Sequence, residues 1–230
     1  MGKLIWKDIQ VQKREKTLFI VIFLSLCVGY VMFTNPGIAS IQLIVGVYLM
    51  ITYANAYDYK YNAEIVINSL PVDRKQIVTA KYLSSLVYCL LMLTVALPVG
   101  ILLSFTGLPG STGFNLGVVG RFIMLSVFIL VLYISFYFPV YYKLGYLNSR
   151  WANFIAFFFI FGSIGFIGAS GRDLPSYGEP MTRETALQYF QGILAGNESM
   201  SFYFSLMGIS ILLLLLSRQL SIAIYRRKEF

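Results

Sequence analysis

The sequence contains no histidine among its 230 residues, only two cysteines, and charged side chains at only 12% of its positions. Without histidine, HExxH metalloprotease sites, Ser-His catalytic pairs and histidine proton relays are excluded. Cys27 and Cys89 lie inside apolar runs without CxxC spacing, so we expect neither a disulfide nor a metal site. A GxxxxGK[ST] phosphate loop is also missing, so we expect no ATP or other cofactor to bind this chain.

Hydrophobic residues make up 58% of the chain and include 17 Tyr and 19 Phe. A soluble domain is nearer half apolar and about a quarter charged. The composition therefore predicts an all-α integral membrane protein that forms a single transmembrane domain over residues 1–230. The net charge of +8 does not indicate a nucleic-acid partner, because the basic residues are scattered over the ends of apolar runs rather than gathered in one stripe.

The apolar runs predict six membrane-spanning helices. A basic amphipathic helix over residues 1–16 is expected on the inner membrane surface, before the first span. The spans are predicted at residues 17–33, 38–57, 82–105, 122–142, 151–170 and 202–217. The basic residues concentrate in the segments that this arrangement places inside, so both termini are expected in the cytoplasm. Between the fifth and sixth spans, residues 182–195 predict an external amphipathic helix that ends at Gly196.

A long polar interval, residues 59–82, separates the second and third predicted spans. Its first part has apolar residues at i, i+3, i+4 and i+7, namely Ala63, Val66, Ile67 and Leu70. This spacing predicts a short amphipathic helix with Glu64 and Asn68 on the opposite face. One interpretation is an interfacial helix on the lipid surface, whose basic residues would pair with head groups. The residues meant are Lys60, Arg74, Lys75 and Lys81.

The second part of the interval predicts another helix. Pro71 ends the short helix, because proline cannot continue the hydrogen-bond ladder. Asp73 with Gln76 three residues later predicts an N-cap and its capping-box partner. A helix is therefore expected to begin at about Arg74 and to run directly into the third span.

This interval resembles the signature of type-2 ABC exporter permeases, the bacterial membrane subunits that dock on a separate ATPase. The matching residues are Glu64, the run Asn68-Ser69-Leu70-Pro71, Asp73-Arg74, Ile77-Val78 and Lys81-Tyr82. The resemblance implies that the short helix is a coupling helix that carries the motion of the ATPase to the membrane helices. The docking residues that it implies are Tyr61, Glu64, Ile65, Asn68, Ser69, Leu70, Pro71, Asp73 and Arg74.

The run from Phe138 to Tyr146, with its Pro, Tyr-Tyr-Lys and Gly, also resembles this family. The resemblance implies a second ATPase contact at Tyr142, Lys143 and Gly145. A simple loop anchored by interfacial tyrosines has the same appearance. Within the family, the chain is similar to permeases that export amphipathic peptides such as phenol-soluble modulins.

The resemblance also implies an assembly. Six helices are too few to enclose a wide path, so two permease chains, expected to be identical, would meet on a two-fold axis. Two ABC ATPase subunits would bind ATP and Mg. The complex would lie in the bacterial plasma membrane, in contact with lipid. The candidate path residues are Asn55, Asn153, Phe157, Phe158 and Phe161, and Gly165 with Ala169 forms a small-xxx-small pair for helix packing.

Two other classes of protein remain open from the residues. A non-transporting immunity or sensor protein could keep the same fold. An intramembrane enzyme is disfavoured, because no nucleophile motif occurs and no charged pair falls within a span. An ion-driven transporter would need a buried carboxylate, and Asp58 at the inner boundary of the second span is the nearest candidate, although we expect a boundary carboxylate to be solvated.

Overall fold

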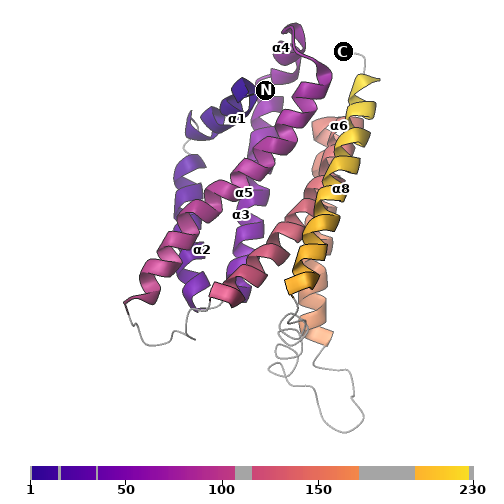
Figure 1. Cartoon of the computed structure of the whole chain (residues 1–230). Helices are drawn as coiled ribbons and strands as arrows, with labels where there is room; N and C mark the ends of the chain where they lie inside the picture. The colour runs from indigo at the N-terminus through magenta and orange to yellow at the C-terminus, as the bar shows by residue number, and fades with distance from the viewer. Residues whose placement is uncertain (1, 15–16, 35, 107–115, 171–199, 228–230) are drawn as a thin grey trace.

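The computed structural model describes residues 2–14, 17–34, 36–106, 116–170 and 200–227, shown as coloured ribbon in Figure 1. Every regular element within these ranges is an α-helix, which confirms the all-helical class. The helices are α1 (Gly2–Arg14), α2 (Thr17–Thr34), α3 (Pro36–Lys60), α4 (Ala63–Ser69), α5 (Arg74–Ser104), α6 (Leu116–Ser170) and α8 (Met200–Arg226). The external helix predicted at residues 182–195 lies outside the described residues.

Four of the described helices are long and apolar enough to cross a membrane, which makes the chain a multi-pass membrane protein. Their apolar stretches are Ile38–Lys60, Arg74–Ser104, Gly117–Ile155 and Tyr203–Arg226. Helix α2 is apolar over a shorter stretch, Phe19–Thr34. The six-span topology and its orientation in the membrane stay predictions.

Helix α6 covers both the fourth and the fifth predicted spans. Its backbone is interrupted at Gly145, which has φ 76° and ψ 173°. Residues that carry a Cβ atom rarely adopt a positive φ, so glycine is the residue that allows the helix to break at this point. The connection predicted between these two spans is therefore reduced to a break around one glycine.

Helix α5 runs through the centre of the arrangement. It packs along α2 and also contacts α1, α3 and α8, while α6 packs mainly against α8 and α3. Figure 1 shows α1, α4 and the C-terminal end of α8 at the same end of the bundle. At that end α5 and α8 approach each other, and they diverge toward the opposite end. We call the end that carries α4 the inner end, in keeping with the predicted orientation.

The core contains a column of aromatic rings along α6. Tyr133, Tyr137 and Tyr141 follow at centroid distances of 5.5 and 5.9 Å, and Tyr142 meets Tyr225 of α8 at 5.0 Å. Rings at these distances add to the stability of the contact beyond the burial of their area. The column ends beneath α4, so it connects the middle of the bundle to the inner end.

Candidate functional site

The α4 elbow, residues 61–74, joins the end of α3 to the start of α5. Asn62 has φ 48° and ψ 37°, in the left-handed region that asparagine tolerates better than most residues. Its backbone amide donates to the carbonyl oxygen of Tyr59 at 3.1 Å. This tight turn ends α3 and lets α4 begin at Ala63.

Asp73 is the N-cap residue of α5, as predicted, but its side chain makes no cap bond, so the predicted capping box is wrong. The Asp73 carbonyl accepts hydrogen bonds from the amides of Gln76 and Ile77 at 2.8 and 3.2 Å. The carboxylate is exposed, so water competes for it. The position of the helix start is instead set by Pro71 before it and by the burial of Ile77 on its first turns.

Helix α4 is rotated relative to the face predicted from its sequence, because Ala63 and Ile67 pack against the core whereas Val66 and Leu70 are exposed. Glu64 is half-buried and Asn68 accepts a hydrogen bond from the Tyr225 hydroxyl at 3.1 Å, so the polar face points inward. Ile67 alone of the predicted apolar set is fully buried. The exposed face is apolar: relative exposures are 57% for Tyr61, 67% for Ile65, 60% for Val66 and 48% for Leu70. The elbow thus presents hydrophobic side chains at the inner end of the molecule.

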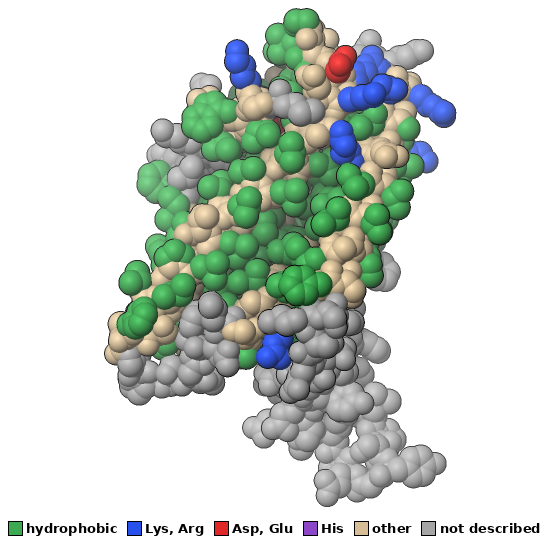
Figure 2. Space-filling view, in the orientation of Figure 1, with side chains coloured by type: hydrophobic (Ala, Val, Ile, Leu, Met, Phe, Trp, Pro, Cys, Tyr) green, Lys and Arg blue, Asp and Glu red, His purple; other side chains and the backbone are tan. Residues whose placement is uncertain are grey.

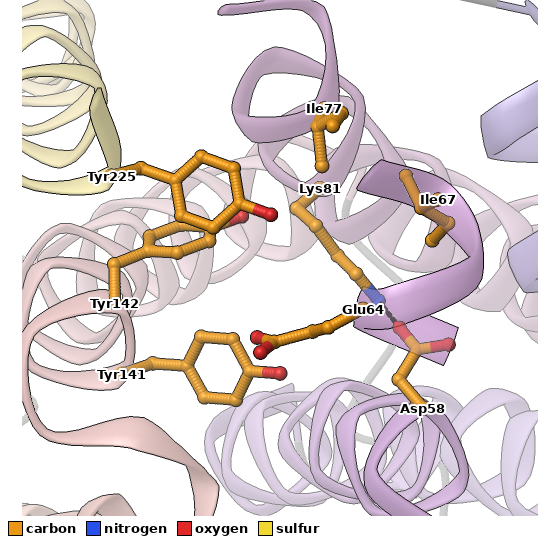
Figure 3. Close-up of a pocket in the computed structure, with 8 residues that line it drawn as sticks. All are labelled: Asp58, Glu64, Ile67, Ile77, Lys81, Tyr141, Tyr142 and Tyr225. Carbon is orange, nitrogen blue, oxygen red and sulfur yellow. Dashed lines mark hydrogen bonds and ion pairs between the residues drawn. The ribbon is translucent and has the colours of Figure 1, made fainter. Parts of the chain in front are cut away.

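A small pocket lies beneath α4. Its lining comes from five helices: Asp58, Glu64, Ile67, Ile77, Lys81, Tyr141, Tyr142 and Tyr225 (Figure 3). In Figure 3 the Glu64 carboxylate points toward the side chain of Tyr141. The pocket has a volume of about 20 Å³. This is the scale of one water molecule, so the pocket is not a site for a transported molecule.

Two buried aspartates and two less buried lysines tie α1, α3 and α5 together next to this pocket. We call Lys7, Asp8, Asp58 and Lys81 the charge network. Lys7 binds Asp58 at 2.7 Å and Asp8 at 3.2 Å, and Lys81 binds Asp58 and, at 3.5 Å, Asp8. Ser84 donates to Asp8 at 2.9 Å. The expectation that Asp58 is solvated is wrong, and so is the placing of Lys81 among lipid head groups, because each is the other's buried partner.

Hydroxyl groups, and an arginine that binds backbone carbonyls, join α5 to α8. The Tyr82 hydroxyl lies 2.7 Å from that of Ser217 and 2.8 Å from that of Ser221. Arg74 donates to the backbone carbonyls of Tyr225 and Arg226 at 3.3 and 3.0 Å, which satisfies two of the open carbonyls at the C-terminal end of α8. We call this set of contacts the α5–α8 junction. It fixes the end of α8 to the α4 elbow.

In the second predicted ATPase contact, Tyr142, Lys143 and Gly145, one side chain is buried and another is exposed. Tyr142 is only 3% exposed and lines the pocket, so its ring is not available on the surface. Lys143 is exposed, and Gly145 forms the break in α6. A docking role for this run stays a prediction, and of its side chains that of Lys143 is placed to meet a partner.

The candidate path residues that the structure describes lie inside the bundle. Asn55 donates to the Tyr137 hydroxyl at 3.2 Å, and Asn153 accepts from the Tyr133 hydroxyl at 2.6 Å. Both asparagines therefore serve contacts within one chain here, and their part in a transport path stays a prediction. Phe157, Phe158, Phe161, Gly165 and Ala169 lie in the part of α6 for which only the backbone is described, so their predicted roles stay predictions.

Sequence reasoning missed a close approach of α2 to α5. A Cβ atom added at Gly29 of α2 would lie 2.7 Å from the carbonyl oxygen of Ala96 and 2.7 Å from the Cβ of Val99 in α5. Only glycine fits such an approach, which brings the two backbones together. A signal for it exists, because Ser25 and Gly29 have small-xxx-small spacing.

Comparison with known families agrees with this architecture. A family model described as "ABC-2 family transporter protein" matches residues 3–226. The match covers nearly the whole chain, so the protein belongs to the ABC-2 family of transporter membrane proteins. No curated protein matches the chain, and no solved structure matches it either. Membership makes the chain a membrane component of an ABC transporter, which implies in general an ABC ATPase as its partner.

Proposed function

We propose that this chain is the permease subunit of an ATP-driven exporter and that the α4 elbow docks on its ATPase. The cargo we propose is amphipathic or hydrophobic, a peptide or a lipid-like molecule, as in exporters of phenol-soluble modulins. It would move along the interface of two identical permease chains in a bacterial plasma membrane, each with one ATPase subunit. The ATP and Mg would be held by the ATPases.

The observation that carries this proposal is the exposed apolar face of α4. Ile65 and Val66 are neighbours on α4, and the exposed side chains of Tyr61 and Leu70 lie just before and just after the helix. A clustered apolar surface on an otherwise polar end of a protein is typical of an interaction site. The inward polar contacts of α4 fix this face outward, where a cleft in a soluble partner could receive it.

The α4 elbow is also connected directly to two long helices, so it can transmit a displacement to them. Only the short extended segment around Pro71 separates α4 from α5, and α5 then continues as one helix from Arg74 to Ser104. Asn68 and Arg74 tie the elbow to α8 at the same time. A displacement of α4 by a partner would therefore reach two of the membrane-spanning helices directly.

The test is to replace single residues of the exposed face in the full-length chain. Ile65→Asp and Val66→Asp would be co-expressed with the candidate ATPase, and the ATPase recovered on the tagged permease would be quantified. We expect roughly tenfold weaker recovery, the usual effect of disrupting one central apolar contact. Lys3→Ala is the control, because Lys3 of α1 is also exposed but lies outside the apolar face.

Glu64→Gln separates direct docking from support of the elbow. Since the carboxylate points into the pocket, we expect it to change thermal stability more than ATPase recovery. A larger loss of recovery in Glu64→Gln than in Ile65→Asp would transfer the docking role to the carboxylate. Full recovery in both aspartate variants would disprove docking through the apolar face.

A further inference from the structure

We propose that the inner end of the α5–α8 pair binds an anionic phospholipid, with Lys75 and Arg218 on its phosphate and Leu215 and Ile211 against its acyl chain. This proposal does not depend on the ATPase or on transport. It rests on the charges of these two helices, on the orientation of Arg218, and on the apolar residues beside it.

The two helices carry positive charge without negative charge. Neither α5 nor α8 contains a carboxylate, and the nearest ones in sequence are Asp73 just before α5 and Glu198 and Glu229 on either side of α8. Figure 2 shows Lys and Arg side chains gathered over the inner end of this face, with an acidic side chain beside them. Lys75, Arg226 and Arg227 are exposed and Arg218 is half-buried. The ion pairs of the described residues all use Asp8 or Asp58, so they leave this group uncompensated.

Arg218 is held in an orientation that suits a phosphate. Its Nε donates to the Thr79 hydroxyl at 2.9 Å, and that hydroxyl donates to the Lys75 carbonyl at 2.7 Å. The guanidinium group is thereby fixed within one helical turn of Lys75. Because the bond to Thr79 uses Nε, the two terminal nitrogens can form a two-pronged contact with phosphate oxygens.

Apolar residues continue from Arg218 toward the middle of the membrane. Ile211, Leu215 and Arg218 fall at i, i+4 and i+7, on one side of α8, and both apolar residues are exposed. With a rise of 1.5 Å per residue, they lie about 10 and about 5 Å below Arg218, within one leaflet of roughly 15 Å. An acidic soluble protein would leave these side chains uncovered. A phospholipid matches both the cations and the apolar residues.

Binding at this site would reinforce the α5–α8 junction. Thr79 and Arg218 already bridge the two helices, and a phosphate between Lys75 and Arg218 would add a second bridge at the same level. A ligand that binds only the folded arrangement raises its stability by mass action. The anionic lipid should therefore raise the thermal unfolding midpoint of the chain.

The experiment uses the full-length protein and measures retained phosphatidylglycerol against phosphatidylcholine by native mass spectrometry. Arg218→Gln should reduce phosphatidylglycerol retention about fivefold, since one basic residue near anionic lipid contributes about 1 kcal/mol. Lys60→Gln removes the same charge elsewhere at the inner end and should have little effect. Thr79→Val keeps every charge but releases Arg218, and should give a smaller loss. Leu215→Ser should lower retention of the lipid without changing competition by inorganic phosphate.

Thermal unfolding in phosphatidylcholine nanodiscs with and without phosphatidylglycerol gives the second measurement. The stabilisation by phosphatidylglycerol should be present in Lys60→Gln and lost in Arg218→Gln. Equal losses in these two variants would show diffuse surface charge instead of a site, and unchanged retention in Arg218→Gln would disprove the site. If Arg218→Gln lost the ATPase while keeping the lipid, the cations would belong to a protein interface. Displacement of the lipid by inorganic phosphate at equal concentration would overturn the acyl-chain contact.

Discussion

The inner end of α5 is fastened differently on its two sides. Toward α1 and α3 it is held by the charge network, in which Lys81 binds Asp58 and Asp8. Toward α8 it is held by hydroxyl groups and by an arginine on backbone carbonyls, as in the contacts of Tyr82 and Arg74. The first side consists of buried full charges, and the second has no charge pair among the described residues.

This difference sets how easily each side can rearrange. A buried charge that loses its partner is strongly unfavourable, so the charge network holds α1, α3 and α5 as one unit. A hydrogen bond between neutral groups contributes about 1 kcal/mol and can be exchanged for another. We infer that the α8 side is the one that can move when the α4 elbow is pushed. Four predictions test this contrast.

Loss of a charge-network partner should have the largest effect. Asp58→Asn leaves Lys81 buried with only the longer contact to Asp8 at 3.5 Å. Breaking a buried ion pair costs about 3 to 5 kcal/mol, so we expect a large drop in the thermal unfolding midpoint of the purified protein. The double variant Asp58→Asn/Lys81→Met removes the uncompensated charge and should recover most of that loss.

The exposed carboxylate of Asp73 provides the control for this prediction. Asp73→Asn makes the same chemical change without a buried partner, and should leave the midpoint nearly unchanged. If Asp58→Asn and Asp73→Asn behaved alike, the buried charges would not be what holds α1, α3 and α5 together.

Overpacking the apolar contact of α5 with α2 should have the next largest effect on stability. Gly29→Leu places a side chain where a Cβ atom would already meet Ala96 and Val99 at 2.7 Å. Overpacking of this kind costs about 1 to 3 kcal/mol, and we expect a lower unfolding midpoint with α2 displaced. Gly208→Leu is the matched control, since no atom lies within 4 Å of its added Cβ. Equal behaviour of the two leucine variants would mean that α2 and α5 do not approach closely.

The hydroxyl contacts on the α8 side should contribute less to the free energy of unfolding. Tyr82→Phe removes the bonds to Ser217 and Ser221, and Ser217 keeps its bond to the Ser135 carbonyl at 2.7 Å. The buried Ser221 hydroxyl loses this partner, at a cost of about 1 to 2 kcal/mol. The unfolding midpoint should fall less than in Asp58→Asn, and Tyr30→Phe on the exposed side of α2 should not change it. A loss as large as that of Asp58→Asn would remove the contrast between the two sides.

The helices themselves could be predicted, because long apolar runs that end at charged residues leave few alternatives. The start of α5 at Arg74 follows in the same way from Pro71 and the apolar residues after it. These are local signals, carried by neighbouring residues. The break at Gly145 was also marked by a glycine, although the sequence suggested a longer connection.

The orientation of α4 and the burial of Asp58 depend on residues that are distant in sequence. Asp58 is buried because Lys7 and Lys81 reach it from 51 and 23 residues away. Helix α4 has only seven residues, and its inward face is decided by Tyr225, 157 residues from Asn68. No periodicity within α4 contains that information. The spacing grouped Ala63 and Ile67 with Val66 and Leu70, and only the packing beneath α4 separates the inward pair from the exposed pair.

The smallest effect should follow from loosening the end of α8. Arg74→Gln removes the donor to the carbonyls of Tyr225 and Arg226, and a cation at a helix C-terminus contributes about 0.3 to 1 kcal/mol. We expect little change in the unfolding midpoint but faster amide hydrogen exchange over the last turn of α8. Lys143→Gln removes an exposed charge away from the α5–α8 junction, and should leave that exchange unchanged. If exchange increased along all of α8 in Arg74→Gln, the end of α8 would be held as tightly as the charge network, and the α8 side would no longer be the one free to move.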